Sequence, residues 1–183
     1  MFPKRSTQLR KRNLITFGIG QKVVYPGQGP YRIGAVVKKV IGGQVESYYR
    51  LVSLAETSDA VLVPLSKIDG LGIRPLMTKA EVSRILRHLA LTSEPATNWQ
   101  QRDFVHLNRL SRGSPNDLAQ IIESLSKLNE RRPLAPRERY ILDRARRFLI
   151  CEMSEVTGES KKITEECLDN ALRVHRGSSR HEK

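Results

Sequence analysis

The only tryptophan of this 183-residue chain lies in a short polar stretch, EPATNWQQRD, that begins at residue 94. Trp99 comes after Pro95 and Asn98 and is followed by Gln100, Gln101 and Arg102. An indole at an exposed helix end, flanked by amide and guanidinium groups, can wedge against unstacked or distorted nucleic acid bases. The alternative is a structural role, in which the indole packs one helix against another.

A second set of candidate residues is a cluster of seven arginines: Arg131, Arg132, Arg137, Arg139, Arg144, Arg146 and Arg147. Only two carboxylates, Glu138 and Asp143, lie among them. Guanidinium groups near a helix start can bind phosphate oxygens, because free backbone N–H groups there also favour anions. A solvated helix face is the alternative explanation of such a charge run.

No set of residues in the sequence suits catalysis, metal binding or nucleotide binding. The stretch GIGQKV at residue 18 has Val23 where a dinucleotide loop needs a third glycine, and no nucleotide-phosphate loop of the G-x-x-x-x-G-K type occurs. The histidines lie far apart and are predicted to be exposed: His88, His106, His175 and His181. Cys151 and Cys167 are predicted to be buried free thiols. We therefore expect a binding protein without a cofactor or metal, and not an enzyme.

The charge balance indicates the class of partner. Lys and Arg number 32 against 19 Asp and Glu, a formal net charge of +13, while 39% of the residues are hydrophobic. This combination predicts a folded protein with a polyanionic partner, either nucleic acid or an anionic membrane surface. No apolar run approaches the ~18 residues of a membrane-spanning helix, and the basic N-terminus lacks the apolar region of a secretory signal. We expect a soluble, cytoplasmic protein that does not bind membranes.

The elements that position these residues fall into two predicted domains. Residues 1–16 are expected to form a flexible basic arm. In residues 17–74, β-prone runs at 23–25, 32–41, 45–54 and 60–64 are separated by turn residues. Gly42-Gly43 predicts a tight hairpin, since two-residue primed turns need positive φ. Strands this short suit a small Tudor-like or SH3-like β barrel.

From residue 75 to 172 the apolar period changes to that of helices, which predicts an all-α bundle and an α+β fold for the chain. Thr78 and Glu81 form a capping box for the first helix, and Ser114 caps the third. The second helix, about 98–112, is expected to bury Phe104, Leu107 and Leu110. A fourth begins near Ala135-Pro136, a short fifth follows Gly158, and 173–183 is expected to be a flexible basic tail.

The chain carries several spaced motifs in both of its halves. In the N-terminal half they are Phe17-x-x-Gly20-x-x-Val23-Val24-Tyr25-Pro26-x-x-Gly29, Tyr49-x-Leu51, Val63-Pro64 and Gly72-Ile73-Arg74. In the helical half they are Asn98-Trp99-x-x-Arg102, Gly113-Ser114, Leu134-Ala135-x-x-Glu138-Arg139 and Ala145-Arg146-x-x-Leu149. Together these motifs resemble the CarD/CdnL-type bacterial transcription regulators. The likeness covers roughly residues 17–172, and its specificity lies in the order and spacing of the motifs.

The resemblance implies a Tudor-like domain that docks on the β subunit of RNA polymerase and a helical domain that reaches promoter DNA. Trp99 would wedge into the minor groove at the upstream edge of the melted bubble and stabilise the open complex. Arg102 and Arg139 fall at family DNA-contact positions, Gln101 stands at a position that is often basic in relatives, and Arg137 joins them by neighbourhood only. Lys39, Leu62 and Pro64 fall at or beside polymerase-facing positions. The free protein would be a monomer, associated with the nucleoid through polymerase.

The sequence departs from the family at a few positions. Gln101 stands where relatives often have a basic residue, Phe104 where a cation is frequent, and Leu62 where some relatives carry arginine. Two other functions remain open. One is an autonomous, sequence-nonspecific DNA-binding protein, and the other is a protein–protein adaptor in which Trp99 is structural.

Overall fold

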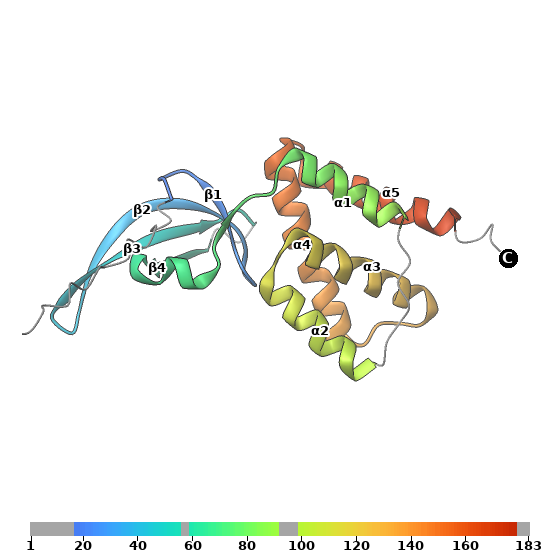
Figure 1. Cartoon of the computed structure of the whole chain (residues 1–183), viewed down its shortest axis with the longest axis horizontal. Coiled ribbons are helices and arrows are strands. Elements are labelled where there is room, and N and C mark those ends of the chain that lie inside the picture. The colour runs from blue at the N-terminus through green and yellow to red at the C-terminus, as the bar shows by residue number, and fades with distance from the viewer. Residues whose placement is uncertain (1–16, 56–58, 92–98, 179–183) are drawn as a thin grey trace, which may run out of the picture.

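The computed structural model describes residues 17–55, 59–91 and 99–178, with the side chains of 91, 99–103 and 175–178 outside that description. Within it, an antiparallel sheet of five strands precedes five α-helices, so the fold is α+β as predicted. Figure 1 shows the sheet and the helices as two bodies joined by a short linker.

The strands follow the order β4-β3-β2-β1-β5 across the sheet. Their bounds are β1 Lys22–Tyr25, β2 Gly29–Ile41, β3 Gln44–Ser53, β4 Ala60–Pro64 and β5 Arg74–Pro75. The first four match the β-prone runs of the sequence. No pattern in the sequence predicted the 3-10 helix η1 (Leu65–Leu71) or the two-residue strand β5.

Two glycine positions shape the long β2–β3 hairpin. Gly42 and Gly43 form its turn with φ of 59° and 79°, which confirms the predicted primed turn. Further along, the register shifts between Ile33 and Val36, so that Gly34 and Ala35 together oppose Arg50. A Cβ on Gly34 would lie 2.9 Å from the Arg50 carbonyl oxygen. The bulge therefore needs glycine, and it bends the hairpin.

The N-terminal core lies on one face of this bent sheet. Strand alternation directs Ile33, Leu51 and Val63 to that face, and each is at most 2% exposed. The remaining buried members of this core cluster are Phe17, Val23, Tyr31, Tyr49, Ile68 and Ile73. The Tyr49 hydroxyl donates a hydrogen bond of 3.1 Å to the Phe17 carbonyl, which fastens the start of the described chain to the sheet.

The helices begin and end close to the predicted caps. They are α1 Lys79–Leu91, α2 Trp99–Arg112, α3 Pro115–Arg131, α4 Pro136–Thr157 and α5 Lys161–Ser178. Thr78 Oγ1 accepts from the Glu81 N–H at 3.2 Å, and Glu81 Oε2 accepts from the Thr78 N–H at 2.7 Å, so the capping box is confirmed. Ser114 Oγ accepts from the Asp117 N–H at 3.1 Å, which confirms the cap of α3.

Helix α4 is central to the bundle, since it contacts the four other helices. Its residues Ile141, Ala145 and Leu149 are at most 1% exposed, at the spacing of one helix face. They share a core with Leu89 of α1, Ile121 and Ile122 of α3 and Leu168 of α5.

Two predictions about the helices are wrong. Phe104 was expected to be buried, but it is 69% exposed, because α2 turns His106 and Leu110 inward and Phe104 lies on the opposite side. Helix α5 was expected to be short, but it has 18 residues and continues to Ser178. No strong helix breaker occurs in the chain between Leu172 and Gly177, so the helix propagates beyond its apolar stripe.

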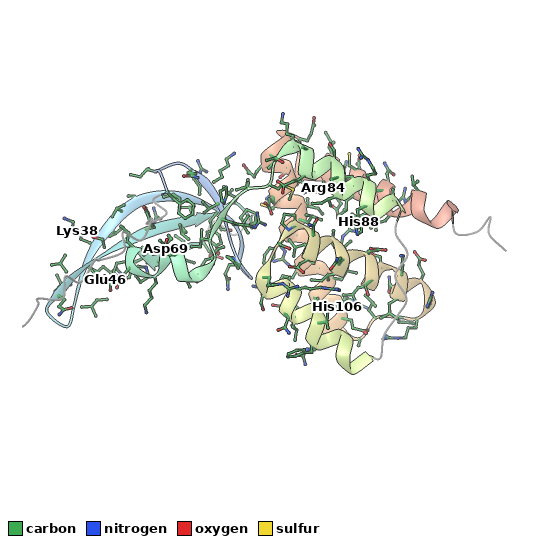
Figure 2. All side chains as sticks on the ribbon, viewed as in Figure 1. Lys38, Glu46, Asp69, Arg84, His88 and His106 are labelled. Carbon is green, nitrogen blue, oxygen red and sulfur yellow. The ribbon has the colours of Figure 1, made fainter. Side chains whose placement is uncertain are left out.

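The titratable groups are also placed differently from some predictions. His106, expected at the surface, is 3% exposed, because it shares the inward stripe of α2. His88 is exposed as expected, whereas the side chains of His175 and His181 lie outside the described residues. Cys151 is buried as expected, but Cys167 is exposed, because it precedes the inward-facing Leu168 on α5. Figure 2 shows His88 and His106 in the helical domain, with Lys38 and Glu46 toward the tip of the β2–β3 hairpin.

Candidate nucleic-acid interface

The seven arginines between 131 and 147 do not act as one set. Three are bonded to other groups of the protein. Arg132 donates to both carboxylate oxygens of Glu138 at 2.9 and 2.8 Å. Arg144 donates to the Gly27 carbonyl at 2.7 Å, and Arg146 donates to Glu165 at 3.1 Å and to Asp169 at 2.8 Å. These three guanidinium groups are therefore structural.

The other four are exposed and make no ion pair with any residue that the structure describes. They are Arg131, Arg137, Arg139 and Arg147. Arg137 and Arg139 lie in the first turns of α4, where the helix dipole favours anions. Arg139 also lines a shallow cavity of about 340 Å³ with Leu134, Pro136, Tyr140 and Asp143. This surface, which we call the α4 start, can receive phosphate groups.

Trp99, Gln101 and Arg102 occupy the first turn of α2. Their side chains lie outside the described residues, so the orientation of the indole stays a prediction. The backbone does bring the two candidate sets near one another. Helices α2 and α4 are in contact, and both begin at the same end of the helical domain in Figure 1.

The three residues predicted to face polymerase share one face of the sheet. Lys39 pairs with Glu46, Leu62 with Arg50, and Pro64 with Tyr48, and alternate residues of a strand point to the same side. Lys39 is exposed, and Leu62 and Pro64 are half-buried. We call this the outer sheet face, made of Lys39, Glu46, Tyr48, Arg50, Leu62 and Pro64.

Sequence reasoning missed Glu46, Tyr48 and Arg50 on this face, and strand register was the signal that could have found them. The Tyr48 hydroxyl donates to Glu46 Oε2 at 2.7 Å, and Ser66 Oγ donates to Oε1 at 3.1 Å. These hydrogen bonds, that of Tyr48 first, lower the pKa of the Glu46 carboxyl. The face thus carries a fixed negative charge opposite Lys39.

A partly buried ion pair joins the two domains. Arg74 of β5 donates from Nη1 to Glu152 Oε1 at 2.7 Å and from Nη2 to Oε2 at 3.0 Å. Glu152, on α4, is 1% exposed. Its Oε1 also accepts from the Met77 N–H at 2.8 Å, and Arg74 Nη2 donates to the Gly113 carbonyl at 2.9 Å.

The turn between β1 and β2 also enters the helical domain. Gly29 lies under the ring of Phe148, where a Cβ would be 2.7 Å from Phe148 Cδ1. Gly113, at the α2–α3 turn, faces the backbone of Gly27, where a Cβ would be 3.3 Å from the Gly27 nitrogen. Lys22 of β1 and Glu155 of α4 form an ion pair of 2.5 Å at the edge of the same contact. Together with the Arg74–Glu152 pair, these contacts form the domain junction.

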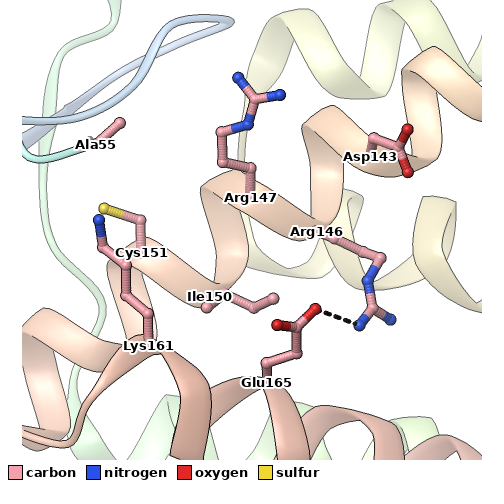
Figure 3. A pocket seen from close by; sticks show the side chains of 8 residues that line it. All are labelled: Ala55, Asp143, Arg146, Arg147, Ile150, Cys151, Lys161 and Glu165. Carbon is pink, nitrogen blue, oxygen red and sulfur yellow. Dashed lines mark hydrogen bonds and ion pairs between the residues drawn. The ribbon is translucent and has the colours of Figure 1, made fainter. Parts of the chain in front are cut away.

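A second cavity, of about 500 Å³, opens between α4, α5 and Ala55 (Figure 3). Arg147 and Lys161 contribute positive charge to it, while Asp143 and Glu165 contribute negative charge. Burial is the main reason that the pKa of the Cys151 thiol in its wall is raised. The mixed charges indicate no ligand class.

Among the residues that the structure describes, no group of three or more His, Cys, Asp or Glu side chains is arranged to hold a metal ion. None of the helices that the structure describes has the length and apolar character required to cross a membrane.

Comparison with known proteins matches both domains. The family described as "CarD-like/TRCF RID domain" matches residues 17–77, and that described as "CarD, C-terminal domain" matches residues 81–169. A relative in Bacillus subtilis (strain 168), "Putative transcription factor YdeB", is 27% identical over 149 residues, which cover 80% of this chain and 95% of the relative. These matches are to a transcription factor family and not to an enzyme family. Since the two domains are matched in order over most of its length, the chain belongs to the CarD family of transcription factors.

Proposed function

We propose that this protein docks on the β subunit of bacterial RNA polymerase and stabilises the open promoter complex through its helical domain. The match to the RID domain implies an interaction with RNA polymerase. The outer sheet face, which unites Lys39, Leu62 and Pro64, is the proposed docking surface for the β subunit.

The observation that carries the DNA half of the proposal is the α4 start. Arg137 and Arg139 are exposed there without an internal partner among the described residues, while the neighbouring Arg132 is neutralised by Glu138. Exposed guanidinium groups at a helix start contact phosphates without reading sequence. With Gln101 and Arg102 on the adjacent start of α2, they would hold the DNA backbone beside Trp99.

The proposed role of Trp99 is to insert at the upstream edge of the melted bubble. Such an insertion stabilises the open complex only by its greater affinity for opened DNA than for closed duplex. One base stacked on an aromatic ring contributes about 1–3 kcal/mol, which changes the ratio of open to closed complexes about 5- to 150-fold.

Docking through the sheet would make this weak contact effective. A domain held on polymerase sees promoter DNA at a high effective concentration, so its intrinsic affinity for DNA can be low. The protein would then act as a monomer, without a cofactor, wherever polymerase occupies a promoter on the nucleoid.

One variant on each surface tests whether the sheet docks on polymerase and the helical domain contacts DNA. Leu62→Glu on the outer sheet face should abolish both polymerase binding and the lengthening of open-complex lifetime. The double variant Arg137→Gln/Arg139→Gln should bind polymerase normally yet shorten the lifetime. Val174→Glu, at a 60% exposed apolar position of α5, controls for the added charge away from the outer sheet face.

The two other functions give different results. An autonomous DNA-binding protein would bind duplex tightly without polymerase, and Leu62→Glu would leave that binding intact. An adaptor without DNA contact would show the same open-complex lifetime with and without Arg137 and Arg139. Either result would contradict the proposal.

A further inference from the structure

The Arg74–Glu152 pair lies where two domains with separate proposed tasks are joined. Arg74 belongs to the sheet, because β5 pairs with β1 and Arg74 is opposite Val24. Glu152 belongs to the helical domain. Only residues 76–78 separate the end of β5 from the start of α1, and Met77, in their middle, is 5% exposed and donates its N–H to Glu152.

The pair fixes the relative orientation of the two domains as well as the distance between them. Arg74 uses four of its five N–H groups, two on Glu152, one on the Gly113 carbonyl and one on the Pro75 carbonyl. A planar guanidinium bound to both carboxylate oxygens and to a backbone carbonyl allows little rotation about the linker. Three segments, the linker, the α2–α3 turn and α4, are thus held in one geometry.

The burial of Glu152, whose side chain is 1% exposed against 26% for that of Arg74, argues for a positioning role. A buried ion pair is often no more stabilising than an apolar contact of the same shape, while the loss of one partner leaves an uncompensated charge. The Arg74–Glu152 pair therefore penalises domain orientations in which Glu152 loses its contact with Arg74. The glycines support this, since Gly29 allows a close approach to the ring of Phe148 and Gly113 a close approach to the backbone of Gly27, both of which a Cβ would crowd.

We infer that Arg74 is a positioning residue that couples the polymerase-docking sheet to the DNA-facing ends of α2 and α4. The inference rests on the proposed function. It states that the free protein already holds the angle at which the helical domain meets the promoter, so that no binding energy is needed to order the linker. Arg74 touches neither polymerase nor DNA in this role.

The test compares Arg74→Met, which keeps a long side chain without charge, with Arg74→Lys, which keeps one charged group. Arg84→Met is the control, because Arg84 is an exposed arginine on α1 whose ion pair with Glu81 lies within that helix. NMR residual dipolar couplings of the full-length chain report domain orientation. Polymerase affinity and open-complex lifetime are then measured for the same proteins.

Arg74→Met should release the domain orientation, leave polymerase affinity within about two-fold, and shorten open-complex lifetime on the order of 5- to 150-fold, the usual scale of coupling between sites. Arg74→Lys should fall between Arg74→Met and the parent, and Arg84→Met should match the parent. If Arg74→Met does not fold, Arg74→Lys is compared with the parent in the same measurements.

Two results overturn the inference. In one, the dipolar couplings of Arg74→Met match those of the parent. In the other, its domains reorient but the open-complex lifetime is unchanged. Trp99→Ala, measured in parallel, separates the two proposals: if it shortens the lifetime while Arg74→Met does not, the inference alone fails. If neither variant changes the lifetime, the proposed function fails and the inference fails with it.

Discussion

Phe148 of α4 covers Gly29 of β2 so closely that a Cβ atom on Gly29 would stand 2.7 Å from Phe148 Cδ1. Real Cβ atoms do not approach an aromatic carbon to that distance, so one of the two groups would have to move. Arg144, one turn before Phe148 on α4, donates to the Gly27 carbonyl of the same turn. The β1–β2 turn is therefore part of the domain junction.

The first prediction concerns this contact. Gly29→Ala should lower the free energy of unfolding by about 1–3 kcal/mol, because the methyl group overpacks against Phe148 and the φ of 100° is strained for alanine. Urea denaturation measures the change. Gly20→Ala is the control, since Gly20 has a similar φ of 87° but nothing within 4 Å of its Cβ position. Equal losses for the two variants would show that the Phe148 contact contributes nothing.

A second prediction separates the two kinds of arginine near the α4 start. Arg139→Gln should reduce the slope of log K against log salt for DNA binding by about 0.9, the value for one lost phosphate contact, and should not change stability. Arg132→Gln should leave the slope unchanged but destabilise the protein, because it removes the guanidinium that binds both carboxylate oxygens of Glu138, whose side chain is 9% exposed. The measurement is a salt titration of binding to duplex with a fluorescent end label, beside thermal unfolding. A reduced slope with unchanged stability for Arg132→Gln would contradict the structural role of Arg132.

These assignments show what sequence could and could not predict. The capping box of Thr78 and Glu81 and the Gly42-Gly43 turn were predictable, since their physical causes act within four residues. Arg144 could not be distinguished from its neighbours, because its partner Gly27 is 117 positions away in the chain. Glu152 was missed for the same reason, since Arg74 lies 78 positions before it.

The misassignment of Phe104 has a different cause. Its spacing from Leu107 and Leu110 is compatible with a buried stripe, but the polar ring of His106 occupies the inward side of α2. The inward face of the predicted helix was chosen from apolar residues alone. The buried His106 shows that the inward face of α2 is rotated away from Phe104. The same limit applies to Trp99, whose orientation no pattern in the sequence could decide.

A third prediction follows from the capping box at α1. The hydrogen bond from the Thr78 N–H, and then that from its hydroxyl, hold the pKa of Glu81 below the ordinary value of 4.5. A carboxyl with a lowered folded pKa stabilises the protein above its unfolded pKa, and this stability is lost as the pH falls through the folded value. Glu81→Gln should therefore destabilise the protein at pH 7 and make little difference at pH 2–3. Unfolding curves at both pH values check this, and a difference that grows in acid would contradict it.

A fourth prediction uses the two thiols to report whether the 500 Å³ cavity opens in solution. Cys167 is exposed and should react rapidly with a maleimide, whereas Cys151 is 2% exposed and its pKa is raised mainly by burial. In a Cys167→Ser background, Cys151 should be labelled at least about ten-fold more slowly than Cys167 in the parent at pH 7, because the thiolate is the reacting form. Mass spectrometry of timed samples measures the two rates. Comparable rates would show that the wall of the 500 Å³ cavity opens readily in solution.

The central claim, that an indole at the start of α2 slows the closing of melted promoter DNA, has one direct test. Trp99→Ala is compared with the parent and with Phe104→Ala, an exposed aromatic position of the same helix, after circular dichroism and polymerase binding have shown that all three are folded and docked. The lifetime of the open complex is measured after a competitor challenge. Trp99→Ala should shorten the lifetime about 5- to 150-fold, the contribution of one stacked base, and Phe104→Ala should change it little. A folded, docked Trp99→Ala protein with the lifetime of the parent would contradict the insertion of the indole.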